Sequence, residues 1–149
     1  MPRTRSSLCS LMLAAGLVPA LARPADDKPA AIEGKWTAES AVRDGQAAGD
    51  VVGNRLSLTG GHFEIRSKDG ELLYAGTFRA SPSAKPAAID FEHAAGSLKG
   101  KTWKGIYDVE GDTLTVCDNA PNLTMGRPPS FMAGKGSGYV LVTFRREQR

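Results

Sequence analysis

The feature that most constrains this chain is a series of short segments in which apolar and polar residues alternate, each ended by Gly, Asp, Asn or Pro. Alternation at every second residue is typical of a strand with one buried and one solvated face. No long stretch repeats apolar positions at helical spacing. The segments predict eight strands, namely Gly34–Val42, Asn54–Thr59, Gly61–Ser67, Glu71–Ala80, Ala87–His93, Thr102–Glu110, Thr113–Asn119 and Tyr139–Arg146.

The connections between several of these segments are short and have hairpin composition. Asp69-Gly70 and Gly111-Asp112 supply the positive φ that tight turns need, and Gly60-Gly61 joins another pair. Consecutive strands joined by tight turns form an antiparallel meander. Eight such strands can close into an up-and-down barrel, which leaves no free edge and has an interior that is either filled or holds one small ligand. We therefore predict an all-β, eight-stranded antiparallel barrel.

The alternation also predicts which side chains point into the barrel, because the intervening residues are mostly polar. For the strand that begins at Thr102 two phases remain open: the inward set is either Trp103, Tyr107 and Val109 or Ile106. The other predicted inward residues are Leu56, Leu58, Phe63, Ile65, Leu72, Tyr74, Phe78, Ile89, Phe91, His93, Leu114, Val116, Val140, Val142 and Phe144.

The N-terminus has the pattern of a secretory signal peptide. Two arginines precede a mostly apolar run, and Ala20-Leu21-Ala22 forms an A-x-A cleavage site. The run is interrupted by Gly16 and Pro19 and is too short for a good membrane span. We expect a signal peptide over 1–22, a flexible linker over 23–32 and the barrel domain over 33–149, in an exported protein that is periplasmic or secreted and has no membrane span after cleavage. An uncleaved N-terminal anchor is the alternative.

Removal of the signal peptide changes the charge and the cysteine count. It leaves 17 basic residues against 16 acidic ones, which gives no electrostatic reason to expect nucleic-acid binding. Cys9 leaves with the signal peptide, so Cys117 stands alone. We expect Cys117 to be a small buried hydrophobe on a strand. A reactive thiol is the alternative, although no adjacent basic residue lowers its pKa.

The segment between Asn119 and Tyr139 does not fit the pattern of short turns. It is rich in Pro and Gly, and connections of this length are often functional or mobile. Its apolar residues predict that it folds back over the barrel mouth, with a mobile insertion as the alternative. Those residues are Leu123, Met125, Phe131 and Met132.

Several motifs occur in one order along the chain. Residues 34–36 form G-x-W, 85–90 form K-P-x-x-I-D, and 105–117 form G-I-Y-x-x-x-G-D-x-L-x-x-C. R-P-x-x-F follows at 127–131 and F-x-R at 144–146. In this order they resemble a lipocalin-like family that is abundant in planctomycetes, over about residues 32–147. The resemblance implies a lipocalin- or calycin-like barrel in a bacterial protein, and it implies no established biochemical activity.

The resemblance also implies how one end of the barrel closes. In lipocalins and related barrels, the tryptophan of G-x-W forms the floor and a basic residue of the last strand packs across it. The matching residues here are Gly34, Trp36 and Arg146.

Three further motif residues have no assigned role in the family. We expect Asp90 and Asp112 to serve in turns or ion pairs, and a catalytic carboxylate pair is the alternative. We hypothesise that Arg127 pairs with one of these carboxylates and so pins the long connection to the barrel.

Nothing in the sequence indicates catalysis. His62 and His93 are the only histidines, and no metal spacing, phosphate loop, dinucleotide fingerprint or hydrolase motif occurs. We expect His62 on the surface and His93 as a polar residue at the barrel rim, with a haem or metal ligand as the alternative. We expect no metal, no cofactor and no enzyme activity.

We therefore predict a monomeric, non-catalytic protein that holds a small, largely apolar molecule in its barrel. The alternatives are a filled barrel that binds or inhibits another protein through the 119–138 segment, and an enzyme at the barrel mouth. The candidate lining residues are Leu58, Phe63, Ile65, Leu72, Tyr74, Phe78, Phe91, Trp103 and Tyr107.

Overall fold

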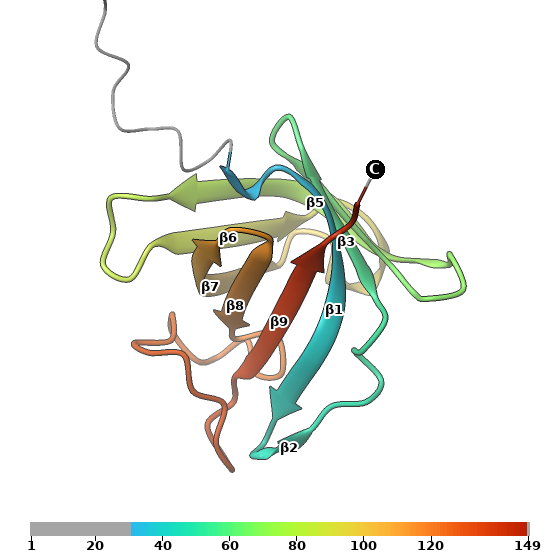
Figure 1. Ribbon diagram of the computed structural model, residues 1–149. Coiled ribbons are helices and arrows are strands. Elements are labelled where there is room, and N and C mark those ends of the chain that lie inside the picture. The colour runs from blue at the N-terminus through green and yellow to red at the C-terminus, as the bar shows by residue number, and fades with distance from the viewer. Residues whose placement is uncertain (1–30, 149) are drawn as a thin grey trace, which may run out of the picture.

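The computed structural model describes residues 31–148 and has a closed eight-stranded antiparallel barrel, which confirms the predicted fold class (Figure 1). Each of the eight barrel strands pairs with the next barrel strand along the chain, and the last pairs with the first. The elements are β1 (Gly34–Arg43), β2 (Gln46–Ala47), β3 (Arg55–Thr59), β4 (His62–Arg66), β5 (Leu72–Ser81), β6 (Ala88–His93), a short 3-10 helix (Gly96–Leu98), β7 (Thr102–Glu110), β8 (Thr113–Asp118) and β9 (Val140–Arg146).

All eight predicted strands are present, and their ends agree with the structure to within a residue at each end. The tight turns behave as expected, since Gly70 and Gly111 have φ angles of 90° and 58°. The two-residue strand β2, which folds back on the end of β1, was not predicted. The turn before it is another Asp-Gly pair, Asp44-Gly45, with φ angles of 56° and 72°.

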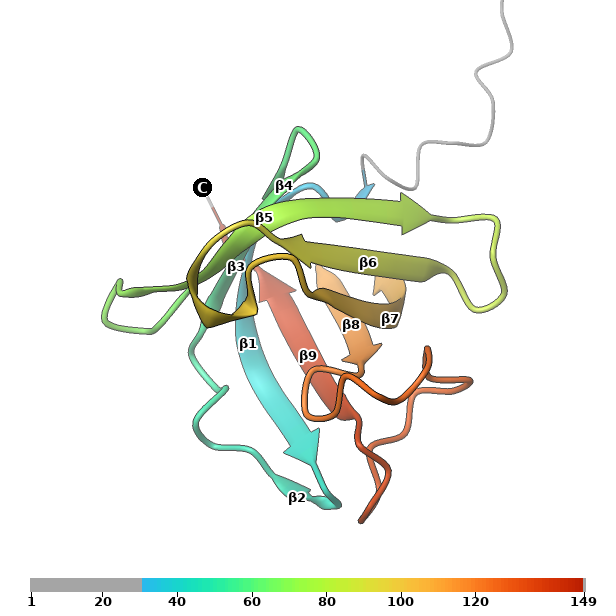
Figure 2. The ribbon, with the colours of Figure 1, turned by 180° about the vertical axis from the view of Figure 1, so that it is seen from behind.

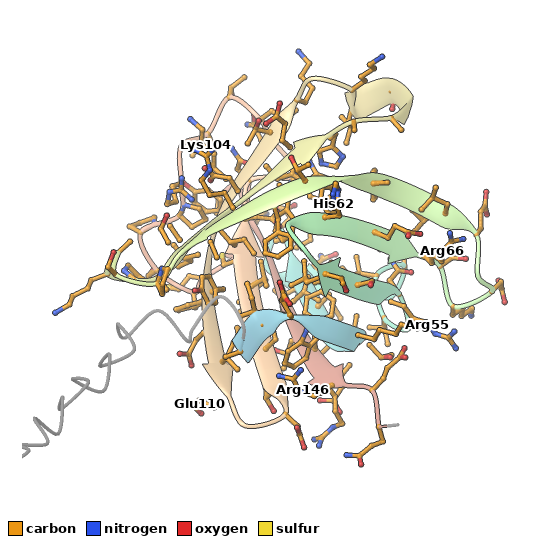
Figure 3. The ribbon with its side chains drawn as sticks, turned by 90° about the horizontal axis from the view of Figure 1, so that it is seen from above. Arg55, His62, Arg66, Lys104, Glu110 and Arg146 are labelled. Carbon is orange, nitrogen blue, oxygen red and sulfur yellow. The ribbon has the colours of Figure 1, made fainter. Side chains whose placement is uncertain are left out.

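One end of the barrel is closed by Trp36 and Arg146. Arg146 lies near the end of β9 (Figure 3). Its guanidinium lies 4.2 Å from the centre of the Trp36 ring and donates to the carbonyls of Glu33 and Ala31 at 2.8 and 2.7 Å. Glycine is favoured at Gly34 because its φ angle is 132°, which residues with a side chain rarely adopt, and a Cβ there would also lie 2.9 Å from Arg146 Nη1. The lipocalin-like closure is therefore present at this end.

The structure corrects the boundary between linker and domain. Ile32 was assigned to the flexible linker, but its side chain is fully buried in the core. Its carbonyl accepts the indole N–H of Trp36 at 2.8 Å. Because an apolar side chain is stabilised by burial beneath the tryptophan, the folded domain includes Ile32.

The phase of β7 is settled by its register. Trp103 and Tyr107 lie in the barrel core and Val109 packs against it, so this set points inward. Ile106 is nevertheless buried, at 1% exposure, on the outer face of the barrel. The reason is an outer layer formed by the segment between β8 and β9.

That segment lies mainly beside the barrel wall (Figures 1 and 2). Its Pro128 and Ala133 are buried, as are Ile106 and Cys117, which are register partners on the outside of β7 and β8. The Cys117 thiol lies 3.6 Å from the carbonyl of Met132. The prediction that the segment covers the mouth is therefore wrong for most of its length. Of its predicted apolar contacts, Leu123, Met125 and Met132 are exposed and Phe131 is half-buried.

The signal peptide, most of the linker and Cys9 lie outside the described residues. Among the residues described, no helix has both the length and the apolar character needed to cross a membrane.

Candidate ligand-binding cavity

A cavity of about 490 Å³ occupies the end of the barrel opposite Trp36. It reaches the surface, because exposed residues at the ends of the strands line it together with buried ones. The lining residues are Arg43, Asp50, Val51, Asn54, Leu56, Ile65, Leu73, Tyr74, Phe91, Ser97, Leu98, Trp103, Val116, Asp118, Ala120, Pro121, Val140, Val142 and Phe144.

Four of the nine predicted ligand-contacting residues line this cavity: Ile65, Tyr74, Phe91 and Trp103. They come from β4, β5, β6 and β7, so one wall is aromatic and apolar. The rings of Tyr74 and Trp103 meet edge to face, with centroids 4.8 Å apart. Contacts of this kind hold both rings in place around the space they enclose.

The other predicted lining residues lie elsewhere. Leu58 and Phe63 are fully buried in the packed core, while Phe78 is half-buried against it. Tyr107 lines a separate hollow of about 340 Å³ that Arg146 also lines. Apart from this hollow beside Arg146, the lower part of the barrel, at the level of Leu58 and Phe63, is filled by side chains. The cavity occupies only the upper part, farther from Trp36.

Leu72 is a clear error, because its side chain is 46% exposed. The pairing of β4 with β5 contains a register shift: Ile65 lies opposite Tyr74, whereas Arg66 lies opposite Leu72. The extra residue in this bulge, Leu73, lines the cavity instead. Strict alternation cannot locate such a bulge, since one extra residue reverses the phase of everything before it.

A second bulge shapes the mouth. The register of β1 with β9 shifts between Ala38 and Ser40, so Ala41 and Arg43 take the inward phase at the end of β1. Arg43 then meets Asp50 across the β1–β3 connection, with contacts of 2.7 and 3.1 Å. Both side chains are largely exposed, so this ion pair adds at most about 1 kcal/mol of stability.

Apolar residues of β3, β8 and β9 complete the wall. Leu56, Val116, Val140, Val142 and Phe144 line the cavity, although they were not named as ligand contacts. Their inward phase was predicted correctly from alternation. Alternation does not show how far along the barrel axis a residue lies, so it could not separate the inward residues that line the cavity from those in the packed core.

Asp118 was not among the predicted site residues. It is the last residue of β8 and lines the cavity with only 7% of its surface exposed. Its Oδ1 accepts the amide N–H of Ala120 at 2.9 Å. Burial raises the pKa of the Asp118 carboxyl to about 7, and the bond from Ala120 acts in the opposite direction. The position could have been found from the period-2 pattern, because Leu114, Val116 and Asp118 share one face.

Asp118 has room because its neighbour on β7 is Gly105. A Cβ on Gly105 would lie 2.9 Å from both the Asp118 Cβ and the Cys117 carbonyl oxygen. This close approach explains a glycine in the middle of a strand.

His93 is not the rim residue that was expected. It points inward as predicted, but it is 2% exposed and packs against Phe63, Tyr74 and Trp103, with its ring 4.2 Å from that of Trp103. Its backbone continues the ladder to Gly100 and Lys101, so the barrel wall extends beyond it. Burial lowers the pKa of His93, which keeps the ring neutral at pH 7.

Cys117 is fully buried, as predicted. Burial raises the pKa of its thiol to about 11, so the thiolate that would react is scarce at neutral pH.

The motif residues form two separate contacts outside the cavity. Arg127 meets Asp90 at 2.7 Å and donates to the carbonyls of Gly105 and Ile89 at 2.7 and 3.3 Å. It thereby ties the 119–138 segment to β6 and β7. Asp112 lies 3.6 Å from Arg146 at the closed end. The two carboxylates therefore serve different contacts.

Over residues 31–148, no group of three or more His, Cys, Asp and Glu side chains is placed to hold a metal ion. Comparison with known proteins found no matching family model and no similar curated protein or solved structure.

Proposed function

We propose that this protein is a non-catalytic, lipocalin-like binding protein that holds a small, largely apolar molecule in the cavity at the open end of its barrel. The observation that supports this most directly is the cavity itself. Its volume of about 490 Å³ lies within the range of roughly 300–1,000 Å³ typical of small-molecule sites. Its walls are mostly apolar and aromatic, with a few polar groups at the mouth.

The cavity favours a carrier over a filled barrel that acts only through its loops. In a filled barrel, inward side chains at every level would pack as Leu58 and Phe63 do at the lower level. At the upper level Ile65, Tyr74 and Leu98 are only partly buried, although they point inward or lie over the opening. An apolar ligand would cover these surfaces, and the burial would stabilise the complex.

The remaining parts of the proposal come from the sequence. The signal-peptide pattern supports export to the periplasm or the outside of the cell, and the ordered motifs support membership of the lipocalin-like family and a bacterial source. We propose a monomer, because closure of the barrel between β1 and β9 leaves only the two-residue β2 with a free edge between residues 31 and 148, which is too short to pair stably with a second copy.

One observation supports a second candidate, a protein partner for the 119–138 segment. Leu123, Met125 and Met132 are exposed on it, and Met132 is 68% exposed. Exposed apolar residues grouped on one segment are common at protein–protein contacts.

Native mass spectrometry of the protein purified from its own host tests the carrier proposal. A retained small molecule would support it, and its mass would narrow the ligand class. A mass equal to that of the chain alone, together with no uptake of the neutral fluorescent probe Nile red, would reject the carrier and leave the protein-partner candidate.

A further inference from the structure

The charges around the cavity are not balanced. Among the described residues, Arg43, Asp50 and Asp118 are the charged side chains that line it. Arg43 and Asp50 neutralise each other in a two-contact ion pair near the solvent. Asp118 has no ion-pair partner between residues 31 and 148, and its Oδ2 accepts no side-chain or backbone hydrogen bond there.

The elements packed against Asp118 offer it no counter-charge. The strands on its two sides place Gly105 and Val140 directly opposite it. Trp103, two residues from Gly105 on the same inner face, is its diagonal neighbour. His93 lies behind that indole and is neutral. A carboxylate at the wall of an apolar cavity therefore lacks the partner that buried charges normally have.

We propose that the ligand is an amphiphilic amine, whose apolar body fills the cavity and whose ammonium head binds the Asp118 carboxylate. This inference rests on the proposed function and names the ligand class for that site. An ammonium group donates charge-assisted hydrogen bonds to a carboxylate, which are among the stronger polar contacts in proteins. A carboxylate or phosphate head meets like charge at Asp118 and finds the nearest guanidinium already paired with Asp50.

The aromatic wall suits the same head group. Tyr74 and Trp103 both line the cavity, and Trp103 is adjacent to Asp118. A cation near an indole face is stabilised by the negative potential of the ring. The missing side chain of Gly105 lets the Asp118 Cβ pack closely against β7, since a Cβ on Gly105 would lie 2.9 Å from it.

The test is displacement of Nile red from the purified protein by three ligands of equal chain length: decylamine, decanol and decanoate. At about pH 8 the Asp118 carboxyl and both charged ligands are ionised. We expect decylamine to bind at least about tenfold more tightly than decanoate, the size of effect expected for one charge-assisted hydrogen bond. Asp118→Asn should reduce this preference to a few-fold. The matched control, Asp69→Asn, makes the same charge change in an exposed turn and should leave the preference intact.

A pH comparison on the unaltered protein keeps the test decisive if Asp118→Asn does not fold. The preference for decylamine over decanol should shrink between about pH 8 and about pH 6, as Asp118 takes up a proton. Equal displacement by all three ligands at both pH values would overturn the amine proposal while leaving the carrier intact. Failure of the protein to take up Nile red or any of the three ligands would overturn both.

Discussion

Arg127 is predicted to hold the outer layer of the molecule against the barrel, and Arg127→Ala tests this. The side chain makes a 2.7 Å and a 3.3 Å hydrogen bond to the carbonyls of Gly105 and Ile89. Its 2.7 Å ion pair with Asp90 is about one-third exposed on each side. Loss of Arg127 therefore removes the polar link between this part of the 119–138 segment and two strands of the barrel.

The magnitude follows from these contacts. A hydrogen bond to a charged group contributes about 1.5–3 kcal/mol, and the longer bond to Ile89 is expected to be weaker. The ion pair with Asp90, which is about one-third exposed, adds up to about 1 kcal/mol because solvent screens it. Ordering the arginine side chain costs about 1.5–2 kcal/mol. The net loss should be about 2 kcal/mol, which lowers the melting temperature of a domain of this size by about 6–10 °C.

Thermal unfolding followed by circular dichroism measures this loss, and limited digestion with chymotrypsin measures the exposure of Phe131. Chymotrypsin is preferred to trypsin because the substitution itself removes a tryptic site. Lys135→Ala removes an equal charge from an exposed position of the same segment and should change stability by less than about 0.5 kcal/mol. If Arg127→Ala melts and is digested like Lys135→Ala, Arg127 does not hold the segment.

Three further predictions concern the barrel itself. Because the pKa of Asp118 rises from 3.8 to about 7 on folding, the native state binds a proton that the unfolded state releases, and stability falls between about pH 4 and pH 7. Asp118→Asn should therefore have the same melting temperature as the unaltered protein at about pH 4 and should be more stable than it at about pH 8, by at most about 4 kcal/mol. A difference in melting temperature that does not change with pH would contradict this. Gly76→Ala should destabilise the protein by more than about 2 kcal/mol in urea unfolding, because the new Cβ would lie 1.9 Å from the Glu92 carbonyl oxygen. An unchanged urea midpoint would show that β5 can shift away from Glu92 at little cost. Leu73→Ala should weaken Nile red binding whereas Leu72→Ala should not, and the reverse order would mean that the bulge in β5 is misplaced.

Most of the barrel could be predicted from the sequence because each strand and each hairpin is indicated by residues within that strand or turn. Each strand is marked by alternation, and each hairpin by a turn residue such as Gly70 or Gly111 that must adopt positive φ. The floor was expected from the family resemblance instead, whose motifs name Trp36 and Arg146, and these residues lie opposite each other in the β1–β9 pair.

The cavity was harder to predict, because it depends on features that alternation does not encode. Two bulges bring Arg43 and Leu73 to the mouth, and neither has a sequence signal as clear as an Asp-Gly turn. Asp118 was overlooked because a charged residue at the end of a strand is normally solvated. The position of the 119–138 segment was predicted wrongly for a different reason. Ile106 and Cys117 are apolar residues on the outer face of β7 and β8, and two such neighbours indicate that another segment packs over them.

The cover over β7 and β8 gives the barrel two mechanically different halves. Ile106 and Cys117 are buried on the outer face of these strands, and Tyr107 and Val116 are buried on the inner face. This part of the wall therefore cannot bend without separating packed side chains on both faces. Beyond β6, by contrast, none of the ten residues of β5 is fully buried, and its outer face is solvated. Fluctuations that widen the entrance should therefore occur along β4 and β5, with fast amide hydrogen exchange there and slow exchange in β7 and β8. A molecule that enters the barrel would then displace β4 and β5, whereas β7 and β8 would keep their positions.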